Sequence, residues 1–253
     1  MKGRNVLMVA GWAHASDDLS ALADLLSVSC TVRTTSPAEL FAAPAEDPEP
    51  ASAAGVSPGA KALYAMTAGG DGPWSLIGWS LGAILALEAA IHLPLNLHRM
   101  AVIGGTARFC AGDEYRWGVP EASLRGMSAG LRKDPEQTLG AFFREAMAPY
   151  PVDPEAIALK TRNALAWGLP SLSRGLEYLR QTDLRGSLAR ISAAVLVIHG
   201  AQDKIVPLDA GRFLSRNLPH GRLQIRPDAG HCEVLQDPRP LAKSILSFLG
   251  GDS

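Results

Sequence analysis

Apolar runs of strand length alternate with helical patterns over the first 107 residues of the chain. Strands are expected at residues 5–10, 28–33, 74–77 and 100–103, and helices at 17–26, 60–67 and 81–92. Because strands that alternate with helices of this length form parallel βαβ units, the pattern predicts an α/β fold with a mostly parallel, doubly wound sheet. Residues 36–59, rich in Ala, Pro, Ser and acidic side chains, are expected to form a solvated loop.

The strand signal disappears from residue 108 to about residue 182, where apolar residues recur at helical spacing. Five prolines in this stretch are expected to mark helix starts or stops, namely Pro120, Pro135, Pro149, Pro154 and Pro170. The sheet pattern then returns with strands at 194–198 and 222–225 and helices at 208–218 and 240–248. We therefore expect a core in two parts, residues 1–107 and 183–253. A helical cap at 108–182 should cover the carboxyl edge of the sheet, where open α/β folds place their sites.

Composition and charge exclude several classes of protein. The chain has 253 residues, with 24 Lys+Arg against 25 Asp+Glu and a formal net charge of −1. The lack of a basic tract argues against nucleic-acid binding. No stretch approaches the ~18 uninterrupted apolar residues that a membrane helix needs, so no membrane span is expected.

The cysteines and the start of the chain bear on the compartment. Cys30, Cys110 and Cys232 are odd in number and form no CxxC pair, which disfavours a disulfide framework or a thiolate zinc site and fits a reducing compartment. Lys2 and Arg4 before the apolar run 6–13 imitate a secretion signal, but that run is short for one and is better interpreted as a core strand. We expect a cytoplasmic protein without a metal or a cofactor.

Two segments match the G-x-S-x-G pattern of a nucleophilic serine, residues 78–82 (GWSLG) and residues 126–130 (GMSAG). Ser80 follows a strand-like run and opens a helix, and such a strand–turn–helix forces a serine into a strained, exposed position. Glycines at 78 and 82 leave room for the strand and helix to pack closely. Ser128 lies inside a helical pattern with no strand before it. The sequence therefore favours Ser80 as the nucleophile.

An acid and a base are expected on loops after later strands, in the order Ser, Asp or Glu, His. Asp203 follows the strand at 194–198 as the candidate acid, and His231 follows the strand at 222–225 as the candidate base. A turn or helix-capping aspartate and a surface-loop histidine are the simpler alternatives. His14 and His199 are expected to cap a helix or to face solvent. The alternative is that they lie at the edge of the pocket.

The tetrahedral oxyanion that forms when Ser80 attacks a carbonyl group needs two backbone N–H donors. Leu81 is one candidate, because it follows the nucleophile at a helix N-terminus. Trp12, in the loop after the first strand, is the second candidate. Its ring could also wall the acyl pocket or fill the core. Cys232, next to the candidate base, is interpreted as a packing residue.

These motifs resemble the α/β-hydrolase superfamily over essentially the whole chain. More narrowly, the chain resembles the pimeloyl-[acyl-carrier protein] methyl ester esterases of biotin synthesis. The features that carry the narrower resemblance are Gly11-Trp12, the 78–82 elbow, the segments 117–120 (WGVP), 175–179 (GLEYL) and 183–185 (DLR), and a cap phenylalanine at Phe142 or Phe143. The resemblance implies that Trp12, Ser80, Leu81, Phe142 and His231 contact the acyl methyl ester, with Phe143 as the alternative phenylalanine.

The chain also departs from the family pattern. The usual His-Gly after the first strand is Ala10-Gly11, and the cap arginines that grip the carrier protein in the family correspond to Gln137 and Ala141. If an acyl-carrier protein is the partner, the nearby basic residues Arg125, Arg132, Lys133 and Arg144 are expected to replace those arginines.

The sequence thus predicts a serine carboxylic-ester hydrolase acting on a small-molecule or carrier-protein-bound acyl ester. Pimeloyl-[acyl-carrier protein] methyl ester is the leading substrate. A general short-acyl carboxylesterase or thioesterase, a carbon–carbon bond hydrolase and a non-catalytic ligand-binding member of the fold are the alternatives.

Overall fold

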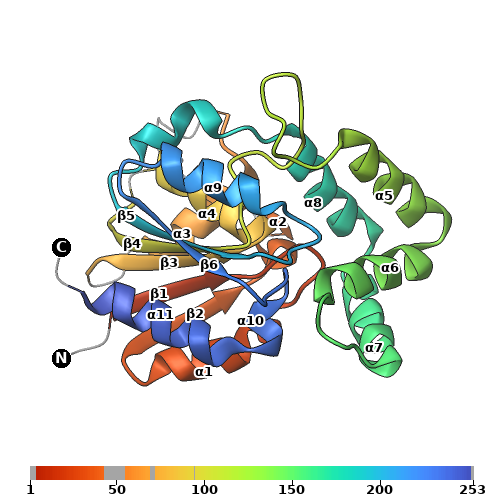
Figure 1. Cartoon of the computed structure of the whole chain (residues 1–253), viewed down its shortest axis with the longest axis horizontal. Coiled ribbons are helices and arrows are strands. Elements are labelled where there is room, and N and C mark those ends of the chain that lie inside the picture. Colours follow the sequence, from red (N-terminus) through yellow and green to blue (C-terminus); the bar gives the residue numbers. More distant parts are fainter. Residues whose placement is uncertain (1–3, 43–54, 69–71, 94, 252–253) are drawn as a thin grey trace.

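A parallel six-stranded sheet forms the centre of the molecule. The structure, a computed structural model, describes residues 4–42, 55–68, 72–93 and 95–251. The strand order is β2-β1-β3-β4-β5-β6, and every neighbouring pair runs parallel. The strands are β1 (Arg4–Val9), β2 (Cys30–Thr35), β3 (Trp74–Trp79), β4 (Leu97–Ile103), β5 (Ala194–Gly200) and β6 (Gly221–Arg226). The predicted α/β fold with a parallel sheet is confirmed (Figure 1).

Helices cover both faces of the sheet. On one face α1 (Ser20–Ser27) packs against α11 (Pro238–Gly250), next to the short α10 (Glu233–Gln236). The other face carries α3 (Pro58–Thr67), α4 (Leu81–His92) and α9 (Leu208–Asn217), as Figure 1 shows. Ten of the twelve residues of α4 are buried, so this helix lies between the sheet and its neighbours. A strand buried on both faces needs a continuous apolar run, and all six residues of β3 are buried.

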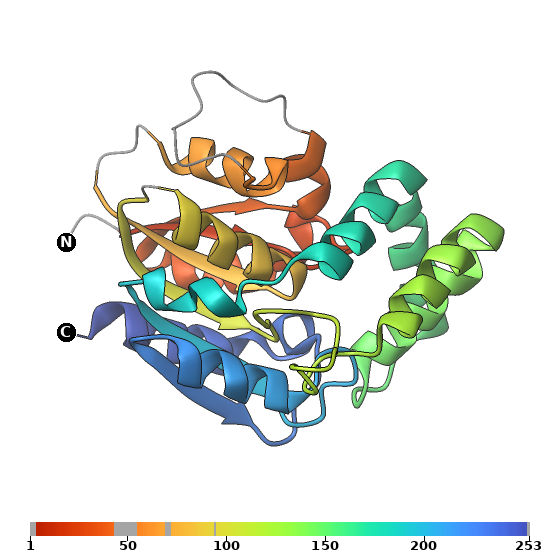
Figure 2. The ribbon, with the colours of Figure 1, turned by 90° about the horizontal axis from the view of Figure 1, so that it is seen from above.

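Four further helices lie beyond the carboxyl edge of the sheet, on the right of Figure 1 and again apart from the sheet in Figure 2. These cap helices are α5 (Glu121–Lys133), α6 (Pro135–Met147), α7 (Pro154–Leu165) and α8 (Leu169–Gln181). Asp134 and Asp153 cap α6 and α7 by accepting backbone N–H bonds, and a proline follows each of them in the first helical turn. The division into a core and a cap at residues 108 and 182 stays a prediction.

The structure corrects the expectation of a loop at residues 36–59. Pro37–Ala42 form the short helix α2, and residues 43–54 lie outside the described residues. Ser36 and Glu39 form a capping box, in which the Ser36 N–H donates to Glu39 Oε2 at 2.6 Å and the Glu39 N–H donates to Ser36 Oγ at 3.3 Å. The alanine- and proline-rich composition of residues 36–59 suggested a loop, although the Ser36/Glu39 capping box is a signal for a helix.

Smaller differences concern the ends of elements. The helix expected over 17–26 begins as a 3₁₀ turn, Ser16–Leu19, before α1. The second strand is β2 at Cys30–Thr35 rather than 28–33, because its partners in β1 extend from Arg4 to Val9. Within the described part of the chain, no helix is both long and apolar enough to cross a membrane.

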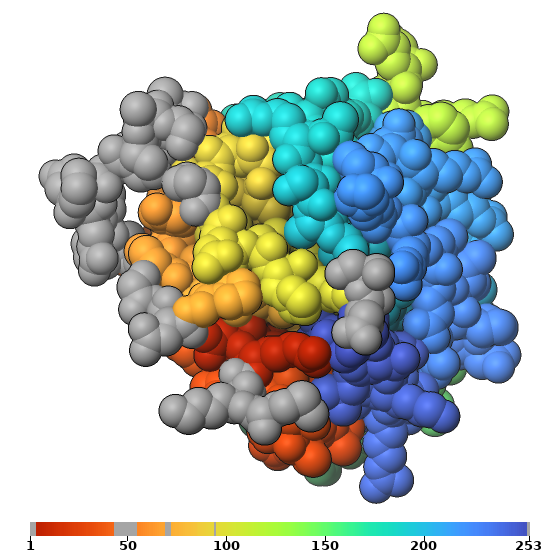
Figure 3. Space-filling view, turned by 90° about the vertical axis from the view of Figure 1, so that its left-hand side faces the viewer, coloured from red at the N-terminus to blue at the C-terminus, as the bar shows by residue number. Residues whose placement is uncertain are grey.

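The start of β1 and the end of α11 lie side by side at the amino edge of the sheet, opposite the cap helices. Figure 3 shows this face, with the red segment of β1 beside the dark blue segment of α11. Arg99 of β4 donates hydrogen bonds to the carbonyl groups of Phe248 and Gly251 at the end of α11. Ser80, Asp203 and His231 follow the carboxyl ends of β3, β5 and β6, at the opposite edge of the sheet.

Candidate active site

Ser80 lies at the sharp turn between β3 and α4. Its backbone has a φ of 56° and a ψ of −120°, the strained conformation that the motif predicts. A Cβ on Gly78 would lie 2.4 Å from Cα of Ala83, and a Cβ on Gly82 would lie 2.4 Å from the carbonyl oxygen of Ala10. Both positions therefore need glycine, because a side chain there would keep the strand and the helix apart. Ser80 itself is partly exposed at the carboxyl edge of the sheet.

His231 forms a bridge between Ser80 and Asp203. Its Nε2 lies 2.9 Å from Ser80 Oγ, and its Nδ1 lies 2.8 Å from Asp203 Oδ2. Asp203 follows β5 and His231 follows β6, so residues far apart in the sequence meet as expected. The arrangement offers the serine hydroxyl a proton acceptor that a carboxylate orients.

Asp203 is held from several sides. Its Oδ1 accepts the backbone N–H groups of Ile205 and Val206, both at 2.8 Å, and its Oδ2 lies 3.5 Å from His199 Nε2. Burial alone would raise the pKa of Asp203, but the charge and hydrogen bond of His231 hold that pKa below its ordinary value. Asp203 is therefore ionised at neutral pH, and its carboxylate accepts the Nδ1 proton of His231.

Two features that the sequence did not reveal fix the place of His231: a hydrogen bond from Trp79 and the space beside Gly104. Trp79, directly before Ser80, donates its Nε1–H to the carbonyl oxygen of His231 at 2.9 Å. Gly104 follows β4 with a φ of 53°, and a Cβ there would lie 3.2 Å from His231 Nδ1 and 3.4 Å from Asp203 Oδ2. Gly104 therefore leaves the space that the imidazole–carboxylate pair occupies. The sequence signal that could have pointed to this role is the Gly-Gly pair at 104–105, directly after the strand expected at 100–103.

The two residues whose amides are expected at the oxyanion lie near Ser80. Leu81 is the first residue of α4, where helix amides have no intrahelical acceptor. Trp12 lies in the turn after β1, which packs against the serine: a Cβ on Gly11 would be 3.3 Å from Ser80 Cβ. Within the described part of the chain, neither amide donates a hydrogen bond to another group of the protein. The role of these two amides at an oxyanion stays a prediction.

A pocket of about 530 Å³ extends from Ser80 between the sheet and the cap helices. Its apolar lining consists of Trp12, Phe109, Val119, Leu124, Met127, Ala141, Phe142, Leu176, Leu179 and Ile205. Polar and charged residues also line it, among them Gln137, Arg144, Glu145 and Lys204. The pocket is thus largely apolar and has the serine in its lining, the form expected for an acyl chain.

The two cap phenylalanines take different places. The rings of Phe142 and Trp12 meet in a T-shaped pair with a centroid distance of 4.8 Å, and Phe142 lines the pocket. Phe143 is fully buried, does not line the pocket, and packs against His14 at a centroid distance of 5.4 Å. Of these two candidates only Phe142 lines the pocket, because neighbours on a helix point about 100° apart. Contact of Phe142 with an acyl group stays a prediction.

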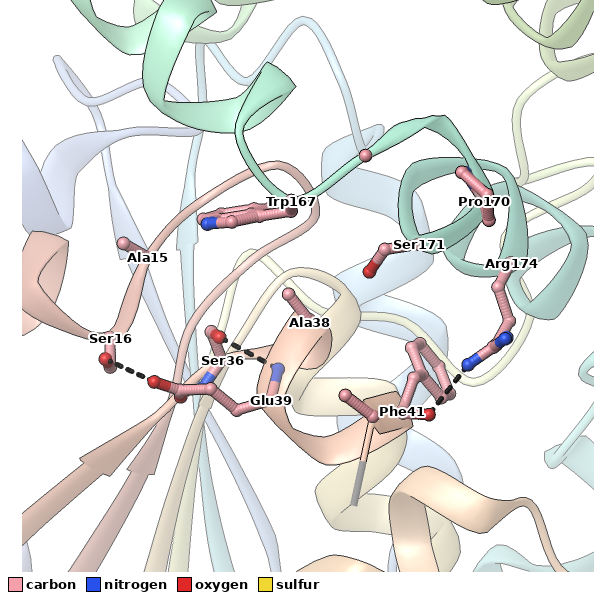
Figure 4. A pocket seen from close by; sticks show the side chains of 12 residues that line it. Ala15, Ser16, Ser36, Ala38, Glu39, Phe41, Trp167, Pro170, Ser171 and Arg174 are labelled. Atoms are coloured by element: carbon pink, nitrogen blue, oxygen red, sulfur yellow. Dashed lines mark hydrogen bonds between the residues drawn. The ribbon is translucent and has the colours of Figure 1, made fainter. Parts of the chain in front are cut away.

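A second hollow, of about 800 Å³, lies between α2 and the start of α8. Figure 4 shows Trp167 and Ser171 on one side of it and Glu39 on the other, with Arg174 donating to the carbonyl oxygen of Phe41 at 2.7 Å. Neither Ser80 nor His231 lines this hollow. It is therefore separate from the reactive serine.

Other residues that the sequence singled out lie elsewhere. Ser128 belongs to the regular helix α5. The three cysteines are buried, and burial raises the pKa of each thiol, Cys232 included. His14 and His199 are buried rather than solvent-facing, and neither lines the pocket. The described residues hold no cluster of His, Cys, Asp and Glu that could bind a metal ion.

The chain is similar to known hydrolases over most of its length. Residues 6–244 match the model of the alpha/beta hydrolase family. A pimeloyl-[acyl-carrier protein] methyl ester esterase of Nitrosomonas europaea is 30% identical over 66% of this chain and 68% of the relative. Relatives of the same name from Edwardsiella ictaluri (30% identical over 73% of this chain and 79% of the relative) and Aromatoleum aromaticum (31% over 69% and 73%) are also similar.

Solved structures share the fold at lower identity. An esterase from Exiguobacterium antarcticum superposes with a TM-score of 0.84 at 17% identity, covering 99% of this chain and 93% of the other. A bromoperoxidase from Bacillus anthracis gives 0.85 at 15% identity with the same coverage. At these identities the likeness supports the architecture and not a particular reaction.

Proposed function

The chain belongs to the alpha/beta hydrolase family, and we propose that it is a serine carboxylic-ester hydrolase that demethylates pimeloyl-[acyl-carrier protein] methyl ester in biotin synthesis. The observation that carries the reaction is the hydrogen-bonded chain from Ser80 through His231 to Asp203, in which Ser80 lines a largely apolar pocket. The names of the relatives support the substrate.

In the proposed mechanism His231 moves one proton in each half of the reaction. Its Nε2 takes the proton of Ser80 Oγ while that oxygen bonds to the ester carbonyl carbon, and the carbonyl oxygen becomes an anion between the Trp12 and Leu81 amides. The carbon–oxygen bond to the methoxy group then breaks, and the proton on His231 passes to methoxide to give methanol. Water attacks the acyl-serine by the same route and restores Ser80.

The pocket suits a medium-length acyl chain. Phe142 and Trp12 meet edge to face near the serine, and the cap helices supply further aliphatic side chains. Each buried methylene contributes about 0.8 kcal/mol, so four of them favour a longer acyl group by up to about 3 kcal/mol before losses from ordering.

The carrier protein would dock on the exposed surface of α5 and α6. Arg125, Arg132, Lys133 and Arg144 are all exposed there, and Arg144 also lines the pocket. Arg125 forms an ion pair with Glu121 at 3.1 Å, which reduces its share of the positive charge. An acidic carrier protein would therefore meet chiefly Arg132, Lys133 and Arg144.

A general short-acyl carboxylesterase is the second candidate function. Gln137 and Ala141, where the family resemblance implies carrier-binding arginines, line the pocket with uncharged side chains. An enzyme for free esters would need no positive charge at these two positions.

The cytoplasmic location stays a prediction, and cell fractionation would test it.

One experiment separates the two candidates. Purified protein is assayed with the methyl ester of the pimeloyl carrier protein and with a p-nitrophenyl ester series, before and after Arg132, Lys133 and Arg144 are changed to Glu. The matched control changes Arg216 and Lys243, which are exposed on the core. We expect kcat/KM for the carrier-bound ester alone to fall, and to fall more at low salt. Equal responses from both substrates, or no turnover of the carrier-bound ester, would support the general esterase instead.

A further inference from the structure

The turn that carries the Trp12 amide has a strained backbone. The N–H of His14 donates to the carbonyl oxygen of Gly11 at 3.2 Å and closes a four-residue turn. Ala13, the third residue of this turn, has a φ of 61°, a left-handed conformation that residues with a Cβ rarely adopt. Such a conformation persists only where the surroundings determine it, so the contacts of this turn decide where the Trp12 amide points.

A chain of polar contacts leads from the turn to the cap. His14 Nδ1 lies 2.8 Å from Asp18 Oδ2, and Asp18 Oδ1 accepts a hydrogen bond from Lys160 Nζ at 2.8 Å. Lys160 belongs to α7, 142 positions further along the chain. The side chains of Asp18 and Lys160 are 26% and 21% exposed, so water only partly screens their ion pair.

The imidazole of His14 is also held by rings. It is 2% exposed and lies 4.3 Å from the Trp79 ring and 5.4 Å from the Phe143 ring, centroid to centroid. Burial lowers the pKa of His14, so the ring is neutral at pH 7. Burial would raise the pKa of Asp18, but the hydrogen bond from His14 and the charge of Lys160 lower it well below its ordinary value. The Asp18 carboxylate therefore accepts the His14 Nδ1 proton and fixes the ring.

A second link joins the same turn to the cap. Trp12 donates its Nε1–H to the carbonyl oxygen of Leu172 in α8 at 2.9 Å. A Cβ on Gly175 would lie 2.5 Å from Trp12 Cδ1, so the small residue lets the indole seat against α8. The turn thus has one anchor on α8 through Trp12 and another on α7 through His14 and Asp18.

We propose that His14, Asp18 and Lys160 form a positioning unit that holds the Gly11–His14 turn so that the Trp12 amide faces the developing oxyanion. The role in the reaction rests on the proposed function. None of the three residues lines the acyl pocket, so their effect on the reaction passes through the turn that they hold. The position of the Trp12 amide then depends on how α7 packs against the core, because Lys160 belongs to that helix.

The test changes Asp18, whose side chain is partly exposed, and not the buried His14. Asp18→Ala removes both hydrogen bonds, Asp18→Asn keeps an oxygen that can accept the His14 Nδ1 proton, and Lys160→Met removes the ion pair alone. Arg162→Met is the matched control, because Arg162 is an exposed cation on the same helix. Two readouts are needed, hydrogen exchange of residues 11–14 and steady-state kinetics with a p-nitrophenyl ester.

In Asp18→Ala we expect amide exchange of residues 11–14 to quicken by about tenfold or more while exchange in β3 stays unchanged. The kcat should fall by about 10- to 100-fold at similar KM, with a parallel rise in the inhibition constant of a trifluoromethyl ketone, whose adduct places an anion at the same amides. Asp18→Asn should recover most of the loss, Lys160→Met should show a smaller one, and Arg162→Met should match the wild type.

Unchanged exchange of residues 11–14 in Asp18→Ala would overturn the proposal, whether or not the enzyme is active. Faster exchange with unchanged kcat and ketone inhibition would also overturn it, because the unit would then only stabilise the fold. A wild-type protein that hydrolyses no ester would contradict the proposed function, and the exchange measurement would still decide whether the unit holds the turn.

Discussion

Trp79 donates its indole N–H to the carbonyl oxygen of His231 at 2.9 Å, so the residue before the reactive serine fixes the loop that carries its base. Trp79 is 1% exposed and its ring lies 6.1 Å from the imidazole, centroid to centroid. The spacing between Ser80 and His231 therefore depends on a side chain that belongs to the same strand end as the serine.

Replacing Trp79 by Phe should keep most of the packing and remove this hydrogen bond. The buried carbonyl of His231 would lose its partner, which costs about 1–3 kcal/mol of unfolding free energy, and kcat should fall by more than KM changes. Urea unfolding and steady-state kinetics measure the two effects. Trp74→Phe is the matched control on the same strand, since Trp74 Nε1 has no hydrogen-bond partner among the described residues. Equal losses in both variants would refute the special role of Trp79.

Asp203→Asn should lower kcat by about 10⁴-fold with little change in the fold, because the amide no longer holds the imidazole in the required tautomer. Asp228→Asn is the control, since Asp228 is exposed on the same loop as His231. Kinetics and circular dichroism check the pair. Near wild-type activity of Asp203→Asn would move the orienting acid to another residue.

The pH dependence of stability should reveal the buried His14. Burial lowers its pKa in the folded state below the ordinary value of about 6.5, so the unfolded chain binds more protons than the folded one as the pH falls. Its contribution to the unfolding free energy is thus fully present above about pH 6.5 and decreases as the pH falls through the folded pKa.

Urea unfolding at pH 7.5 and pH 5.5 measures this effect. The loss of unfolding free energy between the two pH values should be smaller in His14→Gln than in the wild type. His220→Gln should behave like the wild type, because His220 is exposed. The same loss in all three proteins would contradict the assignment of a neutral, buried His14.

Phe142→Ala should raise KM for a hexanoyl or octanoyl p-nitrophenyl ester more than for the acetyl ester. The reason is that Phe142 lines the pocket beside Trp12, and each methylene that loses its apolar contact loses up to about 0.8 kcal/mol. Leu159→Ala, a change at a 51% exposed residue of α7, is the control. A uniform effect across the ester series would place the acyl chain elsewhere.

Parts of the site could be predicted from the sequence because they follow from local rules. The elbow around Ser80 has a fixed glycine pattern, and Asp203 and His231 follow predicted strands, so the topology of a parallel sheet brings them to one edge. The helix at α2 was missed although its capping box, Ser36 and Glu39, stood in the sequence.

Contacts between distant segments could not be predicted in this way. Nothing local pairs Asp18 with Lys160 or Trp79 with the His231 carbonyl, since both contacts depend on how the loops and the cap settle on the sheet. The choice between Phe142 and Phe143 depends on the rotation of α6 about its axis, which the packing against His14 decides. Packing geometry, and not residue type, carries that information.

The most direct test of the central claim is to locate the nucleophile by peptide-mapping mass spectrometry after treatment with a fluorophosphonate. We expect one adduct, on Ser80, and no adduct in Ser80→Ala, while Ser128→Ala labels like the wild type. Hydrolysis of a p-nitrophenyl ester in the same samples should fall by about 10³-fold or more only in Ser80→Ala. An adduct on Ser128, or full ester hydrolysis by Ser80→Ala, would contradict the account.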